Sequence, residues 1–172
     1  EASMVKLLFV LMNEYRLWAL PQALAALERR YPGAVEGRVY SVREINADAG
    51  LERALLADGA AADMAFLASH GSIQNLYCFS RLWEALEGRP VYFTSTMGDE
   101  LAELLPRLGL EPALYAALDS YYQAGSPGDL EGLVLCALNG RFGRDYPLSP
   151  PSPPRGQGVY TLEGFLPPER EA

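Results

Sequence analysis

Val5-Lys-Leu-Leu-Phe-Val-Leu-Met12 decides the fold, because it is a nearly continuous apolar run. A run of this kind is typical of a strand that is buried on both faces of a sheet. Three later segments also have strand character: 38–42, 63–69 and 91–96. Segments with apolar residues at helical spacing lie between and after them: 21–31, 50–58, 73–86 and 99–108. Strands that alternate with helices in this way predict right-handed crossovers and a parallel sheet.

Single residues predict where these helices begin and end. Pro21 suits the first turn of a helix, and Pro32 with Gly33 ends that helix. Gly59 is predicted to close the second helix, and Asp99 to cap the last of the four.

We therefore predict an α/β fold with a doubly wound, flavodoxin-like parallel sheet of about four to five strands. Extra C-terminal helices are predicted over 112–123 and 128–139, followed by a Pro-rich tail. Residues 4–145 form the predicted α/β domain with its helical C-terminal part, and residues 146–172 form a linker and the start of a following segment. Pro147 to Pro154 reads as a stiff polyproline II spacer, because proline rings lock φ and remove donors.

The composition excludes several classes of partner. Asp and Glu number 22 against 14 Lys and Arg, which gives a net charge of -8. Because such a surface repels phosphate and anionic lipid, we expect no nucleic-acid partner. The apolar run Val5–Met12 is too short to cross a bilayer, so we expect no membrane insertion. Cys78 and Cys136 lie in apolar surroundings and read as buried free thiols, which fits the reducing cytoplasm.

Candidate site residues follow the predicted strands, because open parallel sheets bind ligands at the carboxyl ends of their strands. His70 is the only histidine, and it could carry a proton or ligate a metal; the alternative is a hydrogen bond to a loop backbone. The ligand-binding candidates are Asn13, Glu14, Ser69, His70, Gly71, Ser72, Thr94 and Ser95, with Asn46 after the second strand. No residues are spaced as a closed metal site requires, so we predict no metal.

The sequence gives little support for nucleotide-binding, anion-binding or nucleophile–base sites. No Gly-x-Gly-x-x-Gly and no P-loop lysine follow the first strand. Residues 94–99 could hold an anion on backbone N–H groups, but helix capping is the favoured interpretation. The neighbours Ser69 and His70 point to opposite sides of an extended chain, which disfavours a nucleophile–base pair. Aromatic residues on two helices could stack on a flat macrocycle, although a core role is favoured: Tyr77, Phe79, Trp83, Tyr115, Tyr121 and Tyr122.

The second half of the chain carries a family resemblance. A helix with tyrosine leads to a Gly turn and an apolar helix, and a Pro-rich link then enters a Gly-Val-Tyr segment. The positions are Tyr121 or Tyr122, Gly125, Gly128-Asp129-Leu130, the helix through Leu133, Leu135 and Leu138, Pro150 to Pro154, and Gly158-Val159-Tyr160. With the upstream segments 63–72 and 88–93, this order resembles the N-terminal region of the large subunit of cobaltochelatase and of magnesium chelatase. Thr161-Leu162-Glu163 stands where that family usually has His-Pro-Asp.

The resemblance implies a role in ATP-dependent metal insertion. In that family the large subunit binds a tetrapyrrole and inserts cobalt or magnesium, while separate AAA+ ATPase subunits handle ATP. It implies that this chain is a non-catalytic head or lid domain in cobalamin biosynthesis, binding no cofactor itself, with a tetrapyrrole or corrinoid as substrate. Two alternatives stay open: a free-standing flavodoxin-like small-ligand binder or enzyme that uses the His70 edge, and a docking module that uses the apolar tail around Phe165.

Overall fold

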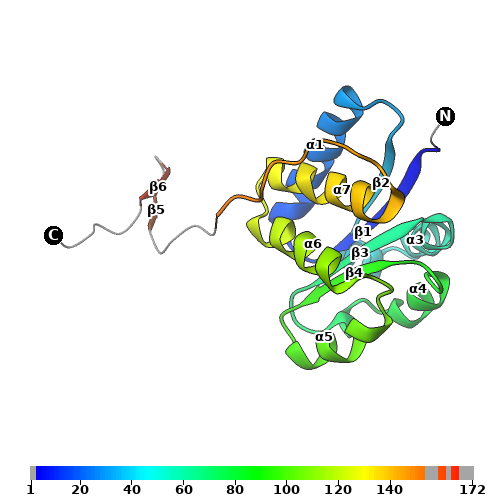
Figure 1. Cartoon of the computed structure of the whole chain (residues 1–172). Helices are drawn as coiled ribbons and strands as arrows, with labels where there is room; N and C mark the ends of the chain where they lie inside the picture. The colour runs from blue at the N-terminus through cyan, green and yellow to red at the C-terminus, as the bar shows by residue number, and fades with distance from the viewer. Residues whose placement is uncertain (1–2, 154–158, 162–163, 167–172) are drawn as a thin grey trace.

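The strand β1 (Val5–Leu11) lies inside a parallel sheet in the computed structural model, which describes residues 3–153, 159–161 and 164–166. Lys6 is its one exposed residue. β2 (Val35–Ser41) and β3 (Met64–Ser69) pair with β1 on its two sides, and β4 (Val91–Ser95) pairs with β3. The strand order is therefore β2-β1-β3-β4, with all four strands parallel (Figure 1).

Helices cover both faces of this sheet (Figure 1). Alternate side chains of β1 enter two separate cores, Leu7 and Phe9 in one and Leu8 and Val10 in the other. The first core is covered by α1 (Glu14–Arg30), α6 (Pro112–Ala124) and α7 (Pro127–Phe142). The second core is covered by α2 (Val42–Ala47), α3 (Ala49–Ala61), α4 (Phe79–Ala85) and α5 (Gly98–Leu104). This arrangement confirms the predicted doubly wound, flavodoxin-like α/β fold.

Helix α1 begins at Glu14, earlier than predicted, so the assignment of Pro21 to its first turn is wrong. The side chain of Asn13 explains the early start, because it accepts the backbone N–H of Arg16 at 3.0 Å. Pro21 removes one backbone hydrogen bond from the helix. The helix nevertheless continues because Leu20 and Leu27, on either side of the proline, are buried in the core.

Gly59 does not close its helix. It lies inside α3, where a Cβ atom would come within 2.9 Å of Leu82 Cδ1 on α4. The glycine therefore permits a close helix–helix approach, which sequence reasoning mistook for a stop signal. Val42, predicted as the end of a strand, instead begins the short helix α2.

The predicted helix over 73–86 is broken into a short 3-10 turn, η1 (Ile73–Asn75), and α4. Asn46 on α2 explains the break. Its side chain donates to Asn75 O at 2.6 Å and accepts the N–H of Tyr77 at 3.1 Å, so it takes backbone groups that a continuous helix would need.

Helix α5 starts at Gly98, and Met97 rather than Asp99 occupies the cap position. Ser95 closes this turn, since its hydroxyl oxygen accepts the N–H of Met97 at 3.0 Å. Asp99 lies in the first turn, where its charge favours the helix dipole. The predicted cap is thus wrong by two positions.

The C-terminal helices α6 and α7 agree with the prediction within a few residues. Tyr115 of α6, together with Leu108 just before this helix, also covers the outer edge of the sheet at β4. The hydroxyl of Tyr115 donates to Phe93 O at 2.8 Å, and the N–H of Val91 donates to Leu108 O at 2.8 Å. These two bonds pair backbone groups of β4 that face away from β3.

The residues 146–153, which we call the strap, lie against α6 and α7. Asn139 donates to Tyr146 O and accepts its N–H, both at 2.8 Å. The described start of the predicted spacer is therefore bound to the domain, while the division of the chain at residue 146 stays a prediction.

Beyond the strap, β5 (Val159–Thr161) and β6 (Gly164–Leu166) form an antiparallel pair. Pro154, Gly158, Leu162, Glu163 and residues 167–172 lie outside the described residues. The docking role expected of the apolar tail stays a prediction.

Both cysteines, Cys78 and Cys136, are buried free thiols as predicted, and burial raises the pKa of each. Within the described ranges, no helix combines the length and the apolar character that a membrane span requires.

Candidate functional site

The carboxyl ends of the four parallel strands share one edge of the sheet, which is where open α/β folds bind ligands. The residues predicted from the sequence all lie there. Asn13 and Glu14 follow β1, Ser69, His70, Gly71 and Ser72 end β3 or follow it, and Thr94 and Ser95 end β4.

After β1, the two predicted residues are built into the start of α1. The side chain of Asn13 is engaged in capping the helix, as described above. Glu14 occupies the exposed first turn, where the helix dipole favours a carboxylate. Both residues are exposed, and of this pair only Glu14 carries a charge.

At the end of β3 the chain turns sharply. Ser69 is buried and its hydroxyl donates to Gly71 O at 2.5 Å, whereas His70 is exposed. Gly71 has φ +85°, a left-handed conformation that would strain any other residue. Because Ser69 is buried and His70 faces solvent, the two do not form a nucleophile–base pair.

This turn is tied to the loop that follows β4. The N–H of Gly71 donates to Thr96 Oγ1 at 2.7 Å, and the hydroxyl of Ser95 donates to Gly71 O at 3.1 Å. Thr94 lies within β4, opposite Ala68. The loop considered for anion binding thus uses two of its hydroxyls to hold the neighbouring turn.

Glu100, which sequence reasoning missed, is the centre of this edge. Its carboxylate accepts the hydroxyl of Ser72 and the N–H of Ile73 at 3.0 and 3.2 Å. It also shares the hydroxyl hydrogen of Ser95, at 3.3 Å, with Gly71 O. The signal in the sequence is weak, because an acidic residue in a first helical turn usually serves only the helix dipole. Here one half-buried carboxylate joins two loops.

The described residues include no group of three or more His, Cys, Asp or Glu side chains placed to hold a metal ion. A cavity of about 1140 Å³ lies next to the carboxyl edge, between the first turn of α1, the end of α6 and the strap. Its lining includes Tyr15, Asp119, Gln123, Gly125, Pro151 and Pro153. This cavity is the roomiest of the three that we describe, and smaller ones of about 420 and 340 Å³ lie under the strap and beside Trp83.

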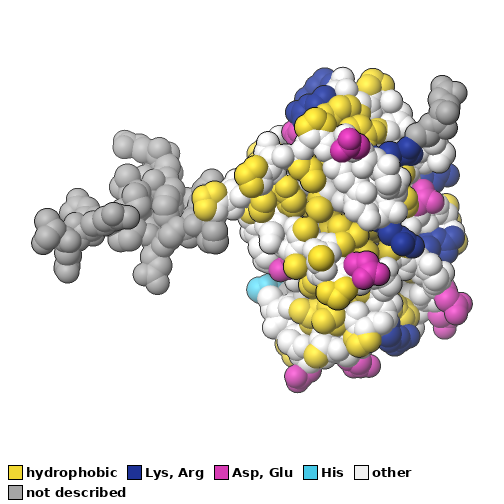
Figure 2. All heavy atoms as spheres, in the orientation of Figure 1, with side chains coloured by type: hydrophobic (Ala, Val, Ile, Leu, Met, Phe, Trp, Pro, Cys, Tyr) yellow, Lys and Arg dark blue, Asp and Glu magenta, His cyan; other side chains and the backbone are white. Residues whose placement is uncertain are grey.

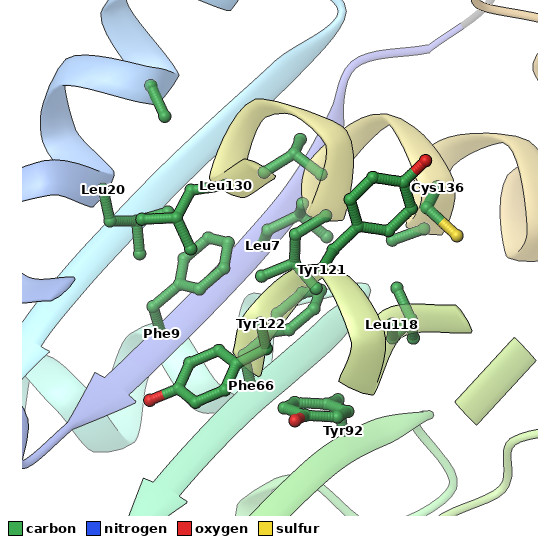
Figure 3. Packing of buried hydrophobic residues seen from close by; sticks show 14 of the residues in the cluster. Leu7, Phe9, Leu20, Phe66, Tyr92, Leu118, Tyr121, Tyr122, Leu130 and Cys136 are labelled. Atoms are coloured by element: carbon green, nitrogen blue, oxygen red, sulfur yellow. The ribbon is translucent and has the colours of Figure 1, made fainter. Parts of the chain in front are cut away.

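The aromatic residues weighed as a stacking wall mostly belong to the core. Phe79, Tyr121 and Tyr122 are buried, and only Tyr77, 79% exposed, faces solvent fully. Figure 3 shows Tyr121 and Tyr122 leaving α6 in different directions, Tyr122 towards Phe66 and Tyr121 towards α7. The core interpretation is therefore the better one for this set.

Tyr92 on β4 is the centre of the aromatic core. Its ring centroid lies 5.4 Å from that of Tyr115 and 5.6 Å from that of Tyr122. Its hydroxyl donates to Asp119 Oδ1 at 2.7 Å. Burial, together with this bond, raises the pKa of Tyr92 far above its usual value, and burial raises the pKa of Tyr115 and of Tyr122 to about 12. These phenols stay protonated at physiological pH and act as packing groups, and the hydroxyls of Tyr92 and Tyr115 also donate hydrogen bonds.

No family model and no curated protein sequence matches this chain. Among solved structures, the chain is similar to the catalytic subunit of cobaltochelatase from Mycobacterium tuberculosis, with a TM-score of 0.60 and 14% sequence identity. The match covers 86% of this chain and 11% of that chain, so this chain spans a small part of the neighbour's length. At this identity the likeness shows a shared fold.

Proposed function

We propose that this chain is the N-terminal domain of a cobaltochelatase-type large subunit and is itself non-catalytic. In this proposal it contributes to ATP-dependent insertion of cobalt, or of magnesium, into a tetrapyrrole, in the cytoplasm and in cobalamin biosynthesis. The observation that carries the proposal is the match of 86% of the chain to 11% of a cobaltochelatase catalytic subunit. The order of segments in the sequence also resembles that family.

The chemistry of the carboxyl edge supports a non-catalytic role. The hydroxyls of Ser69, Ser72 and Ser95 donate to groups within the edge itself. Glu100 is used by Ser72, Ser95 and a backbone N–H. Because these groups are committed to holding loops, they are poorly placed to act as nucleophile, base or metal ligand. The metal ion and the tetrapyrrole would then be substrates handled elsewhere in the larger subunit, and ATP would be handled by AAA+ partner subunits.

The test uses the natural polypeptide that contains these residues, together with its ATPase partners. Insertion of Co²⁺, and separately Mg²⁺, into a tetrapyrrole is followed by the absorbance of the macrocycle. Removal of residues 1–153 should lower the rate, and the isolated chain should show no insertion with ATP and either metal. Metal insertion by the isolated chain alone would contradict the proposal, as would a natural polypeptide that ends at Ala172.

A second candidate function is a small-ligand binder that uses the His70 edge. The exposure of His70 beside the left-handed turn at Gly71 favours it. Titration of the chain with a corrin precursor measures binding directly, and His70→Ala should abolish that binding while leaving the thermal midpoint unchanged. A variant that loses stability but keeps its binding would make the imidazole a structural group.

A further inference from the structure

The strap carries a three-residue repeat, Ser149-Pro150-Pro151-Ser152-Pro153-Pro154. Proline fixes its own φ, and the residue before a proline is held in extended or polyproline II conformations. Nearly the whole repeat is restricted in one of these two ways. Because a polyproline II helix has three residues per turn, Ser149 and Ser152 lie on the same edge of the strap.

Both serines are exposed, but one backbone group of each bonds to the domain. The hydroxyl of Tyr121 donates to Ser149 O at 2.5 Å. The ring of Tyr121 packs closely against Gly132 of α7, where a Cβ atom would come within 2.5 Å of Tyr121 Cε1. This packing with α7 positions the hydroxyl that donates to the carbonyl of Ser149.

The second contact needs a backbone donor. The N–H of Ser152 donates to Asp129 Oδ1 at 2.8 Å. The other oxygen of this buried carboxylate is already occupied, since it accepts the N–H of Ser126 at 3.1 Å and its hydroxyl at 2.5 Å. One oxygen thus caps α7 and one is left for the strap. A proline at position 152 would offer no N–H, so the proline run is interrupted where a donor is required.

The surroundings fit an extended ligand. A groove of about 420 Å³ runs between α7 and the strap, with Arg30, Glu131 and Leu135 among its lining residues. Figure 2 shows hydrophobic side chains spread across the side of the molecule formed by α6, α7 and the strap. Upstream, the side chain of Asn139 bonds to both the N–H and the C=O of Tyr146. The ring centroids of Tyr146 and Tyr31 lie 4.5 Å apart.

We propose that the α6–α7 surface is a binding site for a polyproline II segment. It recognises a backbone carbonyl through Tyr121 and, three residues later, a backbone N–H through Asp129. Its ligand class is a proline-rich segment of the form X-Pro-Pro-X, in which the last X is not proline. In this chain the site is filled by the chain's own strap, which is thereby held against the domain at Ser149 and Ser152.

The test compares two substitutions in the full chain. Ser152→Pro keeps the polyproline conformation but removes the N–H, whereas Ser152→Ala keeps the N–H and removes only the hydroxyl. A synthetic peptide of residues 146–154 is then added, and its binding is followed by NMR shifts of Tyr121 and Asp129. The S152P chain should bind the peptide saturably, because its own strap is released. The wild-type and S152A chains should not bind it.

Two controls make the result decisive. The same peptide with proline at the position of Ser152 should bind the S152P chain at least about tenfold more weakly, the scale of one lost hydrogen bond to a charged group. Adding Tyr121→Phe to the S152P chain should weaken binding of the normal peptide, which tests the contact between Tyr121 and the Ser149 carbonyl separately. Equal binding of both peptides, or an S152P chain that binds neither while its thermal midpoint is unchanged, would overturn the proposal.

Discussion

The hydroxyl of Tyr92 on β4 donates to the carboxylate of Asp119 on α6 at 2.7 Å, which joins the last strand of the sheet to the C-terminal helices. Tyr92 has an exposed fraction of 0%, so its hydroxyl has no access to bulk water. Asp119 therefore supplies the hydrogen-bond acceptor for the Tyr92 hydroxyl, which lies within an otherwise apolar cluster.

Replacement of Asp119 by alanine should therefore destabilise the domain. The buried hydroxyl of Tyr92 would lose its acceptor, and we expect a cost of about 1–3 kcal/mol in the free energy of unfolding. Urea unfolding measures this cost. The double variant Tyr92→Phe/Asp119→Ala removes both partners and should recover part of the loss. Strictly additive effects of the two substitutions would show that the bond does not couple them.

Replacement of Glu100 by alanine should loosen the carboxyl edge of the sheet. The N–H of Ile73 and the hydroxyls of Ser72 and Ser95 lose a shared acceptor, so the amide of Ile73 should exchange with solvent faster, and stability should fall by roughly 1–3 kcal/mol. Hydrogen exchange read at single amides makes the measurement. Glu103→Ala, an exposed position on the same helix, is the matched control and should change neither quantity.

Asp129 should make the stability of the domain fall at acid pH. Burial raises its pKa, but hydrogen bonds from Ser126 and Ser152 outweigh burial, and the resulting pKa lies below the usual value. A carboxyl with a lowered pKa contributes stability above its unfolded value of about 3.9, and that contribution is lost as the pH falls through the folded value. The difference in unfolding free energy between wild type and Asp129→Asn should thus shrink below about pH 4. Asp145→Asn, at an exposed site, is the matched control.

Two glycines of α7 should respond to alanine in opposite directions. At Gly132 a Cβ atom would come within 2.5 Å of the Tyr121 ring, so Gly132→Ala should cost about 1–3 kcal/mol. At Gly128 the nearest atom would be Ser126 Oγ at 3.9 Å, so Gly128→Ala should leave stability unchanged or raise it by up to about 1 kcal/mol. Thermal unfolding of the two variants gives the comparison. Equal effects would mean that the contact with Tyr121 does not limit the packing of α7.

Three strands, β1, β3 and β4, were predictable because each is a short apolar run whose character depends on its own residues. The strand β2 contains Glu36, Gly37 and Arg38, and the prediction missed its first three residues. Several helix ends were not predictable, since tertiary contacts decide them. The sequence pattern makes Gly59 resemble the end of a helix, whereas in the structure Gly59 allows close contact with Leu82 of another helix. Asn46 breaks the predicted helix over 73–86 although Asn46 lies in a different part of the chain. Local patterns carry no information on either contact.

The residues of the candidate site were likewise only partly predictable from the sequence. Sequence reasoning placed Ser72 and Ser95 at the correct edge of the sheet, because strand ends are readable from the sequence. It missed Glu100, which acts only through partners in two different loops. It also read the proline run as a spacer, since nothing local indicates that Tyr121 and Asp129 would hold it.

The hydrogen bonds at the outer edge of β4 affect how this protein can bind other molecules. An open sheet edge offers a template on which the strand of another polypeptide can grow. Such a strand would seek the N–H of Val91 and the C=O of Phe93, and these two groups are already bonded to Leu108 and Tyr115. At these two residues an added strand would first have to displace Leu108 and Tyr115, which disfavours polymerisation through this side of the four-stranded sheet.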